Sequence, residues 1–385
     1  DPAKGGTVSS LFVKGMDREF VRGAGGPRRF NELRGYFSAA GAWWSSADAA
    51  ATVTVTEPGP IRATVRIEGT IGPHPFATEL SVAAGRARID VRTTVKFPIG
   101  RPTTARPGKP EPFAVGASPP PAGKGDENGN RRAFFDSRPK LQALFPVTLD
   151  RPTLDKSAPF DVCRTAHADA AFDTWLGAKH NVIVDWVDAV AGDGSAGLAV
   201  MTDHTTEYHH GAGEPLGLVL GYAGGGVWRD YPMDAEPTAA YAIVPHGGDW
   251  RAGRLWRERA EWAEPLVAAA ATGPGSAALG GAGPGAGGGW SLLDGPAEGL
   301  DVPAVHVRDG RVEVRLFHTG YGGGKSLAVR LARPVVGAEL VELDGRVIAD
   351  LPIWGRGDDG TIGLELPGVP MFGVRTLRLR IGATH

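Results

Sequence analysis

Hydrophobic and polar residues alternate with a period of two along the most regular segments of the chain. Five segments share this pattern: Thr52–Thr56, Ile61–Glu68, Arg88–Val95, Val312–Phe317 and Val374–Ile381. In a strand, this period turns Val, Ile and Leu to one face and Arg, Thr and Glu to the other. We therefore expect half-buried antiparallel strands packed as sandwiches, and an all-β fold. Only residues 250–271 show the spacing of a helix.

Two irregular stretches divide the chain. Residues 98–139 are rich in Pro, Gly, Lys and Arg with almost no apolar period, which indicates a long loop. Residues 273–289 are Gly-rich and of low complexity, as in a linker. The chain has 385 residues, more than the ~250–300 at which one hydrophobic core stops growing. We therefore predict a larger β-domain over residues 1–272 and a smaller one over residues 290–385.

Composition excludes several classes of partner. The 41 Lys and Arg nearly balance the 43 Asp and Glu, so neither a nucleic acid nor an anionic membrane surface is an expected partner. The single cysteine, Cys163, excludes an internal disulfide and a paired-thiol metal site. No apolar run approaches the ~20 residues of a membrane helix. The start at Asp1 carries neither a signal-peptide core nor an initiator Met, so we expect a trimmed beginning, and the compartment stays unknown.

Several short motifs follow one another along nearly the whole chain, from Gly6 to about Ile381. In order they are GTVSSLFVK (6–14) with Arg18-Glu19, FNEL (30–33), GPIRA (59–63), RARIDV (86–91), LFPV (144–147) and YAIVPHGGDW (241–250). The last is the most specific, and the order of the series strengthens the others. Together they resemble the region that follows the catalytic domain in glycoside hydrolase family 38, the α-mannosidase-like family.

The resemblance implies a galactose-mutarotase-like β-supersandwich followed by a smaller β-sandwich. It also implies a retaining glycosidase whose aspartate nucleophile and zinc ion lie on an amino-terminal α/β barrel and helical bundle, before residue 1. We therefore expect no catalytic residue, metal site or cofactor in this chain, which also lacks an HExxH spacing. The expected partners are a carbohydrate substrate and an N-terminal catalytic domain or subunit.

The densest polar segment is Asp203–Pro215, which holds three of the ten histidines. Its composition alone is typical of an exposed turn. In the family, a segment ending in a similar Gly-x-Gly-Glu-Pro-Leu turn lends an arginine to the sugar pocket, and His210 takes that position here. We therefore name Tyr208, His209, His210 and Glu214 as candidate substrate-binding residues, since such groups hydrogen-bond or stack on sugars.

Aromatic residues near the start of the chain supply the remaining candidates. Tyr36 matches a strand tyrosine that reaches the substrate in some family members, and we expect it beside the polar segment; a plain strand tyrosine is the alternative. Trp43 and Trp44 could form a stacking platform, although paired aromatics usually leave one ring in the core. His246 and Asp249 belong to the most specific motif and are interpreted as structural.

Two other functions remain open from the sequence. The chain could be a free-standing carbohydrate-binding protein that uses the Trp43-Trp44 or Tyr208–His210 surface. It could also be an epimerase or polysaccharide lyase on a related supersandwich, with His210 and a Tyr or Glu as base and acid. Fold analogy alone supports the second alternative.

Overall fold

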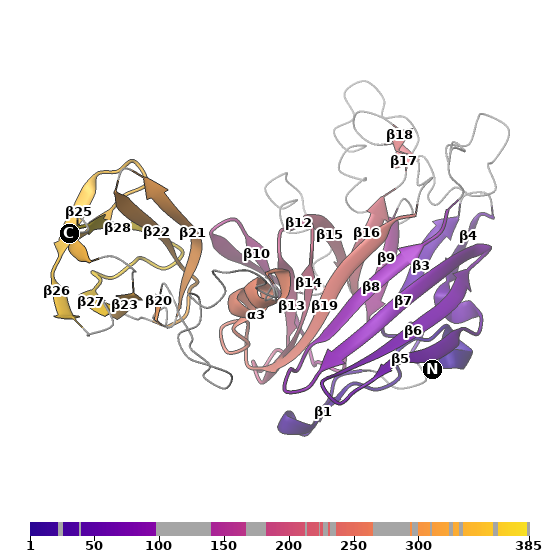
Figure 1. The fold of residues 1–385 in the computed structure, drawn as a ribbon. Helices are drawn as coiled ribbons and strands as arrows, with labels where there is room; N and C mark the ends of the chain where they lie inside the picture. Colours follow the sequence, from indigo (N-terminus) through magenta and orange to yellow (C-terminus); the bar gives the residue numbers. More distant parts are fainter. Residues whose placement is uncertain are drawn as a thin grey trace, which may run out of the picture. The chain divides into compact units, whose positions relative to one another are not determined.

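The computed structural model forms two compact units, Asp1–Leu255 and Trp256–His385 (Figure 1). The structure describes residues 1–21, 26–37, 40–97, 140–166, 182–211, 214–222, 224–225, 230–231, 236–264, 293–294, 299–308, 310–322, 326–330, 334–356 and 361–382. The expected loop over 98–139 and the expected linker over 273–289 lie outside these residues.

The first unit is built from antiparallel strands. They are β1 (Phe12–Val13), β2 (Arg18–Glu19), β3 (Glu32–Phe37), β4 (Ala42–Ser45), β5 (Thr52–Pro58), β6 (Arg62–Ile71), β7 (His74–Ala83), β8 (Ile89–Val95), β9 (Lys140–Phe145), β10 (Thr153–Ala158), β11 (Asp161–Ala166), β12 (Val182–Ile183), β13 (Trp186–Val190), β14 (Ala196–Thr202), β15 (Thr206–Gly211), β16 (Glu214–Tyr222), β17 (Gly224–Gly225), β18 (Asp230–Tyr231) and β19 (Thr238–Gly247). Short 3-10 helices span Pro2–Lys4, Lys14–Met16 and Ser46–Asp48. A nine-stranded sheet has the order β11-β10-β13-β14-β19-β8-β7-β6-β5, and a six-stranded sheet has the order β12-β15-β16-β9-β3-β4.

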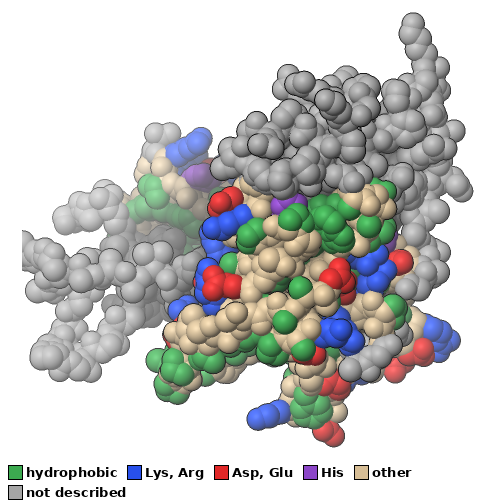
Figure 2. All heavy atoms as spheres, turned by 90° about the vertical axis from the view of Figure 1, so that its right-hand side faces the viewer, with side chains coloured by type: hydrophobic (Ala, Val, Ile, Leu, Met, Phe, Trp, Pro, Cys, Tyr) green, Lys and Arg blue, Asp and Glu red, His purple; other side chains and the backbone are tan. Residues whose placement is uncertain are grey.

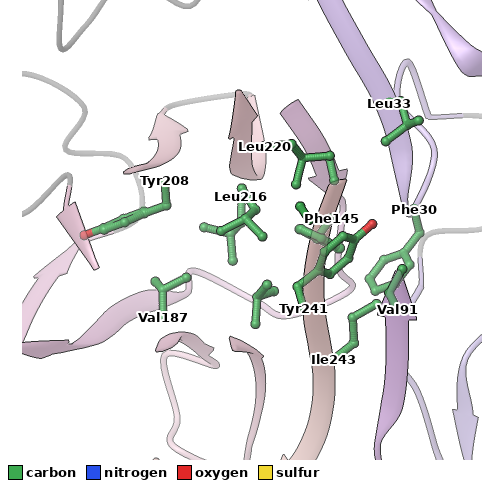
Figure 3. Close-up of a cluster of buried hydrophobic side chains, with 14 of the residues drawn as sticks. Phe30, Leu33, Val91, Phe145, Val187, Tyr208, Leu216, Leu220, Tyr241 and Ile243 are labelled. Carbon is green, nitrogen blue, oxygen red and sulfur yellow. The ribbon is translucent and has the colours of Figure 1, made fainter. Parts of the chain in front are cut away.

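One hydrophobic core joins the two large sheets of the first unit (Figure 3). Phe145 of the six-stranded sheet contacts Tyr241 of the nine-stranded sheet, with ring centroids 6.0 Å apart. The Tyr241 hydroxyl donates a hydrogen bond to Asn31 Oδ1 at 2.6 Å. Asn31 has a φ of 62°, a left-handed conformation that asparagine tolerates better than most residues. The FNEL motif thus directs the chain into β3, and the hydrogen bond to its Asn31 side chain links the two sheets.

Strand β5 differs from the half-buried strand predicted over Thr52–Thr56. It is the last strand of the nine-stranded sheet, and the side chains of Val53 and Val55 are 39% and 62% exposed. They share a face with Ile67 of the core, but the six-stranded sheet is narrower and leaves this edge uncovered. Alternation therefore predicted the strand and its face correctly, and burial incorrectly.

The turn that contains Trp250 and precedes the helix, which we call the Trp250 corner, covers the side of the nine-stranded sheet that faces away from the core, near β13 and β14. Trp250 is buried and lies 6.0 Å from Trp186, centroid to centroid. The Asp249 carboxylate accepts hydrogen bonds from the backbone N–H groups of Arg251 and Ala252, at 3.0 and 3.3 Å, which holds the turn before the helix.

The helix itself is shorter than the 250–271 expected from the sequence. Within the described residues it is α3, Leu255–Ala263, and residues 265–271 lie outside the description. Two features explain the shorter range. The Asp249 turn occupies the first residues, and the sequence places Pro265 after Glu264, where the residue before a proline disfavours helical geometry.

The second unit contains two further antiparallel sheets. Its strands are β20 (Leu293–Asp294), β21 (Leu300–Arg308), β22 (Arg311–His318), β23 (Ser326–Arg330), β24 (Val335–Val341), β25 (Val347–Leu351), β26 (Ile353–Arg356), β27 (Thr361–Glu365) and β28 (Val374–Ile381). The orders are β21-β22-β28-β24-β25 and β20-β23-β27-β26. They share a second core that includes Leu316, Leu364 and Leu377. The predicted all-β fold, a supersandwich followed by a smaller sandwich, is confirmed.

The described surface carries charges of both signs. Figure 2 shows one side of the molecule, where Lys and Arg side chains are interspersed with Asp and Glu. This mixture agrees with a formal net charge of -2. No helix in the described part of the chain combines the length and apolar character needed to cross a bilayer.

Candidate functional site

The six-stranded sheet turns an unusually polar and aromatic face away from the core. Leu33, Ala143, Leu218 and Tyr208 lie in one cross-strand row and all belong to the core. Residues that alternate with them along each strand point to the opposite side, which we call the outer face. Its residues are Glu32, Arg34 and Tyr36 of β3, Trp43 of β4, Lys140, Gln142 and Leu144 of β9, Val219 of β16, and Glu207 and His209 of β15.

Three side chains at one edge of the outer face form an aromatic and cationic cluster. Tyr36 and Trp43 are cross-strand neighbours whose rings meet edge to face, with centroids 5.7 Å apart. The Arg34 guanidinium lies 4.6 Å from the Trp43 ring centroid, a cation–π distance. All three are partly exposed. Trp44 points the other way and packs against Phe37 of the core.

A buried ion pair and a buried amide lie near the centre of the same face. Lys140 Nζ is 2.9 Å from Glu207 Oε2, and the two side chains are 2% and 20% exposed. Gln142 is 3% exposed, and its Nε2 has no hydrogen-bond partner within the described residues. Burying such groups costs free energy unless they are paired, so a cluster of them on a sheet face indicates a role beyond packing.

His209 is the member of the predicted set that the strand register places on the outer face. It is opposite Gly217, which has little bulk. A Cβ at Gly217 would lie 3.0 Å from Gln142 Oε1 and 3.7 Å from His209 Cβ. A Cβ would also lie 3.0 Å from Leu144 Cδ2, so the glycine allows Gln142 and Leu144 to pack closely against the backbone of β16.

Tyr208 and His210 are directed inward instead. The segment expected to be a turn forms the hairpin β15–β16, and Tyr208 is part of the core with 1% exposure. Burial raises the pKa of its phenol, and its hydroxyl has no hydrogen-bond partner in the described part of the chain. His210 is 3% exposed and stacks on Tyr208 at 5.4 Å. Neither side chain is open to a ligand in this structure, which also disfavours His210 as the base of a lyase or epimerase.

The register also separates Tyr36 from the polar segment. Arg34 pairs with Gln142, so Tyr36 is level with Lys140, whereas Leu216 pairs with Phe145. Glu214, exposed at the start of β16, therefore lies about seven residues further along the sheet, or roughly 20 Å. The expectation that Tyr36 lies beside the whole segment is not met by this geometry, because sequence motifs do not fix strand register.

His246 is held in the interior of the first unit. Its Nε2 lies 3.0 Å from Asp188 Oδ1 and its Nδ1 lies 3.2 Å from the Gly247 carbonyl oxygen. Asp249 caps the neighbouring turn, as described above. Both residues therefore make contacts of a structural kind.

Metal ligands do not gather among the described residues: no group of three or more His, Cys, Asp or Glu side chains has metal-binding geometry there. The described part of this chain therefore offers no set of side chains that fits the zinc ion implied by the resemblance. That zinc remains an expectation for a catalytic domain.

Lys140 and Gln142 were missed by the sequence interpretation, and Arg34 was not singled out. The signal was present in Lys140–Phe145, where polar residues alternate with Leu141 and Ala143 at a period of two. All six residues of this strand are buried. The alternation therefore separates a polar buried face from an apolar buried face, and neither face is exposed to solvent.

Comparisons with known proteins agree with this architecture. The model of the glycosyl hydrolases family 38 C-terminal domain matches residues 2–223. An α-mannosidase from Enterococcus faecalis V583 superposes with a TM-score of 0.62 at 13% identity, over 98% of this chain and 41% of that one. A family 38 glycosyl hydrolase from Enterococcus faecalis gives 0.58 at 12% identity, over 98% and 42%. No curated protein sequence matches.

These identities show the fold alone, and the chain spans about two fifths of the length of these two structures. The family model carries more weight, because it covers more than half of the present chain. The chain therefore belongs to glycosyl hydrolase family 38 and contains that family's C-terminal domain.

Proposed function

We propose that this chain is the β-sandwich portion of a glycoside hydrolase resembling retaining α-mannosidases, which helps to form the carbohydrate pocket and docks the catalytic domain. The observation that carries the proposal is the outer face, and above all its cluster of Arg34, Tyr36 and Trp43. Partly exposed aromatic rings beside an arginine are the groups that stack on sugar rings and anchor protein interfaces.

In this proposal the chain helps to bind and orient the carbohydrate, and the catalytic domain cleaves the glycosidic bond. The Tyr36 phenol can donate to a sugar oxygen, and Arg34 can donate to a hydroxyl or to a carboxylate of the catalytic domain. His209 and Gln142 extend the same face toward the centre of the sheet. The nucleophile and the zinc ion would come from the catalytic domain, which is the carbohydrate-facing partner of this surface.

The first test concerns the chain by itself. We expect the purified 385-residue chain to hydrolyse no aryl α-mannoside and to bind no stoichiometric zinc, as measured by release of the aryl alcohol and by elemental analysis. Turnover that survives repurification, or one tightly held zinc per chain, would contradict the proposal and favour an independent enzyme.

The second test uses the chain joined to its catalytic domain. Arg34→Ala and Tyr36→Phe should each lower kcat/KM about 5- to 10-fold, the effect of losing one hydrogen bond of about 1 kcal/mol or somewhat more. The matched control is Glu68→Gln on β6, which should leave kcat/KM unchanged. If both outer-face variants kept the parent kinetics and the parent thermal stability, the outer face would not form part of the carbohydrate pocket.

A further inference from the structure

The strand β5 forms an open edge of the nine-stranded sheet (Figure 1). Its segment Thr52–Thr56 alternates Thr and Val, and all five residues are exposed. Within the described part of the chain, this segment pairs with β6 alone. The side of β5 that faces away from β6 therefore keeps backbone N–H and C=O groups that a further strand could use.

Edge strands of soluble proteins are usually short, or they carry charges or proline, and these features discourage pairing with another chain. The other edge strands of the described sheets have such features. The features are Asp161 and Arg164 in β11, Pro303 and Arg308 in β21, Asp350 in β25, and a length of four residues or fewer in the remaining edge strands. In contrast, Thr52–Thr56 contains neither a charge nor a proline, and Val and Thr both favour strands. Its sequence is therefore suited to pairing with a further strand.

The same segment is complementary to a second copy of itself, because Thr-Val-Thr-Val-Thr reads identically in both directions. A two-fold axis through Thr54 would pair two copies antiparallel, with Val53 opposite Val55 of the second copy. Opposed residues share a face, so the valines of both copies would meet on one side and the threonines on the other. The backbone groups match as well. Either Thr54 or the Val53–Val55 pairs would exchange the hydrogen bonds, depending on which residues turn their N–H groups away from β6.

The charged side chains beside this segment are neutralised within their own chain. Glu57 Oε2 lies 2.6 Å from Arg62 Nε. On the neighbouring strand β6, the Arg66 guanidinium lies 3.1 Å from Glu68 and 2.9 Å from Glu79. Two copies can therefore approach edge to edge without bringing unpaired like charges together.

We propose that two copies of this chain pair antiparallel through Thr52–Thr56 of β5, so that their nine-stranded sheets join into one continuous sheet. The inference goes beyond the proposed function, because it concerns contact between copies of the chain and uses no residue of the outer face.

The contact is small and closed. The register of β5 with β6 shifts between Val55 and Glu57, and Pro58 ends the strand, so pairing does not extend past the bulge. The opposite edge of the sheet, β11, carries Asp161 and Arg164, which disfavours further addition there. We therefore expect a dimer and no filament, with a dissociation constant on the order of 10–100 µM, as for small interfaces.

Sedimentation equilibrium of the 385-residue chain tests the proposal, at loading concentrations from about 1 to about 500 µM. The parent chain should show a reversible monomer–dimer equilibrium. Thr54→Lys and Thr54→Glu each place like charges opposite one another at the two-fold axis, and each should weaken the dimer about fivefold or more. An equimolar mixture of the two variants should associate again, because opposite charges then face each other.

The matched control is Val307→Lys, which introduces a lysine at a 71% exposed valine of another edge strand, β21. This variant should associate like the parent chain. Thr54 is itself exposed, so its substitutions remove no core contact, and the thermal transition of each variant checks that it is folded.

A parent chain that stays monomeric over the whole concentration range would overturn the proposal. The same conclusion would follow if both Thr54 variants associated as strongly as the parent, or if their mixture associated no better than either variant alone. The measurement is repeated on the chain joined to its catalytic domain, where a dimer is again expected. A joined protein that remains monomeric would assign the β5 edge to the catalytic domain and refute pairing between copies.

Discussion

At the residue scale, the His246 imidazole occupies a slot between two glycines. A Cβ at Gly197 would lie 2.4 Å from His246 Cε1, and a Cβ at Gly253 would lie 2.7 Å from His246 Cγ. Gly197 is also the cross-strand partner of His246. The Pro-His-Gly-Gly motif therefore depends on small residues elsewhere in the chain, which no single motif reveals.

This slot leads to a stability prediction. Gly197→Ala should destabilise the first unit by about 1–3 kcal/mol, because the new methyl overlaps a ring and the Asp188 carboxylate, neither of which has space to move. Urea unfolding followed by tryptophan fluorescence measures the change. Gly15→Ala is the matched control, since nothing lies within 4 Å of its Cβ, and an equal loss in both variants would contradict the argument.

The pair formed by His246 and Asp188 also makes stability depend on pH. Burial alone would lower the pKa of His246, but the charge of Asp188 and the hydrogen bond to it outweigh burial, and the pKa is raised. Burial raises the pKa of Asp188, against the opposing effect of His246. The folded chain therefore holds the proton of the His246 imidazolium more tightly than the unfolded chain does.

The sign of the effect follows from this proton balance. When the native state binds more protons than the unfolded state, the free energy of unfolding falls as pH rises. The His246 contribution is fully present below the unfolded histidine pKa of about 6.5 and is lost as pH passes through the raised folded pKa. We expect the urea midpoint to fall as pH rises above 6.5.

Asp188→Asn tests this linkage. It removes the charge that favours the imidazolium form of His246, while the amide keeps nearly the same shape. The decline of the urea midpoint above pH 6.5 should flatten in this variant, and Glu68→Gln should retain the parent profile. A parent midpoint that is constant or rises in this pH range would refute the prediction.

At the scale of elements, periodicity located strands but not their partners. The strands β6, β8, β22 and β28 were expected from alternation and lie where it placed them within a few residues. In contrast, β13 and β14 are buried on both faces and show no alternation, because the Trp250 corner covers their outer side. A strand that is buried on both faces has few polar residues, so its sequence lacks the alternation of apolar and polar positions.

The candidate site was predictable only in part for the same reason. The sequence indicated a histidine-rich segment, but only the register shows that His209 lies on the outer face and Tyr208 in the core. The Tyr36–Trp43 contact likewise depends on the pairing of β3 with β4. Such pairing is decided by the whole core and not by local pattern.

The link between the two sheets gives a prediction for these elements. Tyr241→Phe removes the hydrogen bond from the phenol to Asn31 Oδ1 and leaves a buried acceptor without its donor, which should cost about 1–3 kcal/mol. Asn31→Gly keeps the left-handed backbone accessible and removes the acceptor. A double-mutant cycle measures the coupling, and strictly additive losses would show that this bond does not hold the sheets together.

At the scale of the whole molecule, stability rests on two separate hydrophobic cores. The core of the first unit and the core of the second share no residue, and the division falls between Leu255 and Trp256. Cooperative unfolding requires that contacts be lost together, so two cores of this kind should unfold in two transitions. Sequence length alone had suggested more than one core, without showing where each one ends.

Two matched core variants test this independence. Leu377 of β28 and Leu198 of β14 are both 0% exposed and belong to different cores. Each change to alanine should cost about 2–5 kcal/mol, because it removes buried methyl groups and leaves a cavity. In differential scanning calorimetry, Leu377→Ala should lower one transition and Leu198→Ala the other, each leaving its counterpart within about 0.5 kcal/mol, as expected for sites that share no core residue. A single transition that moves with both variants would mean that the two units unfold as one cooperative body, and the assignment of a separate core to each would then fail as an account of stability.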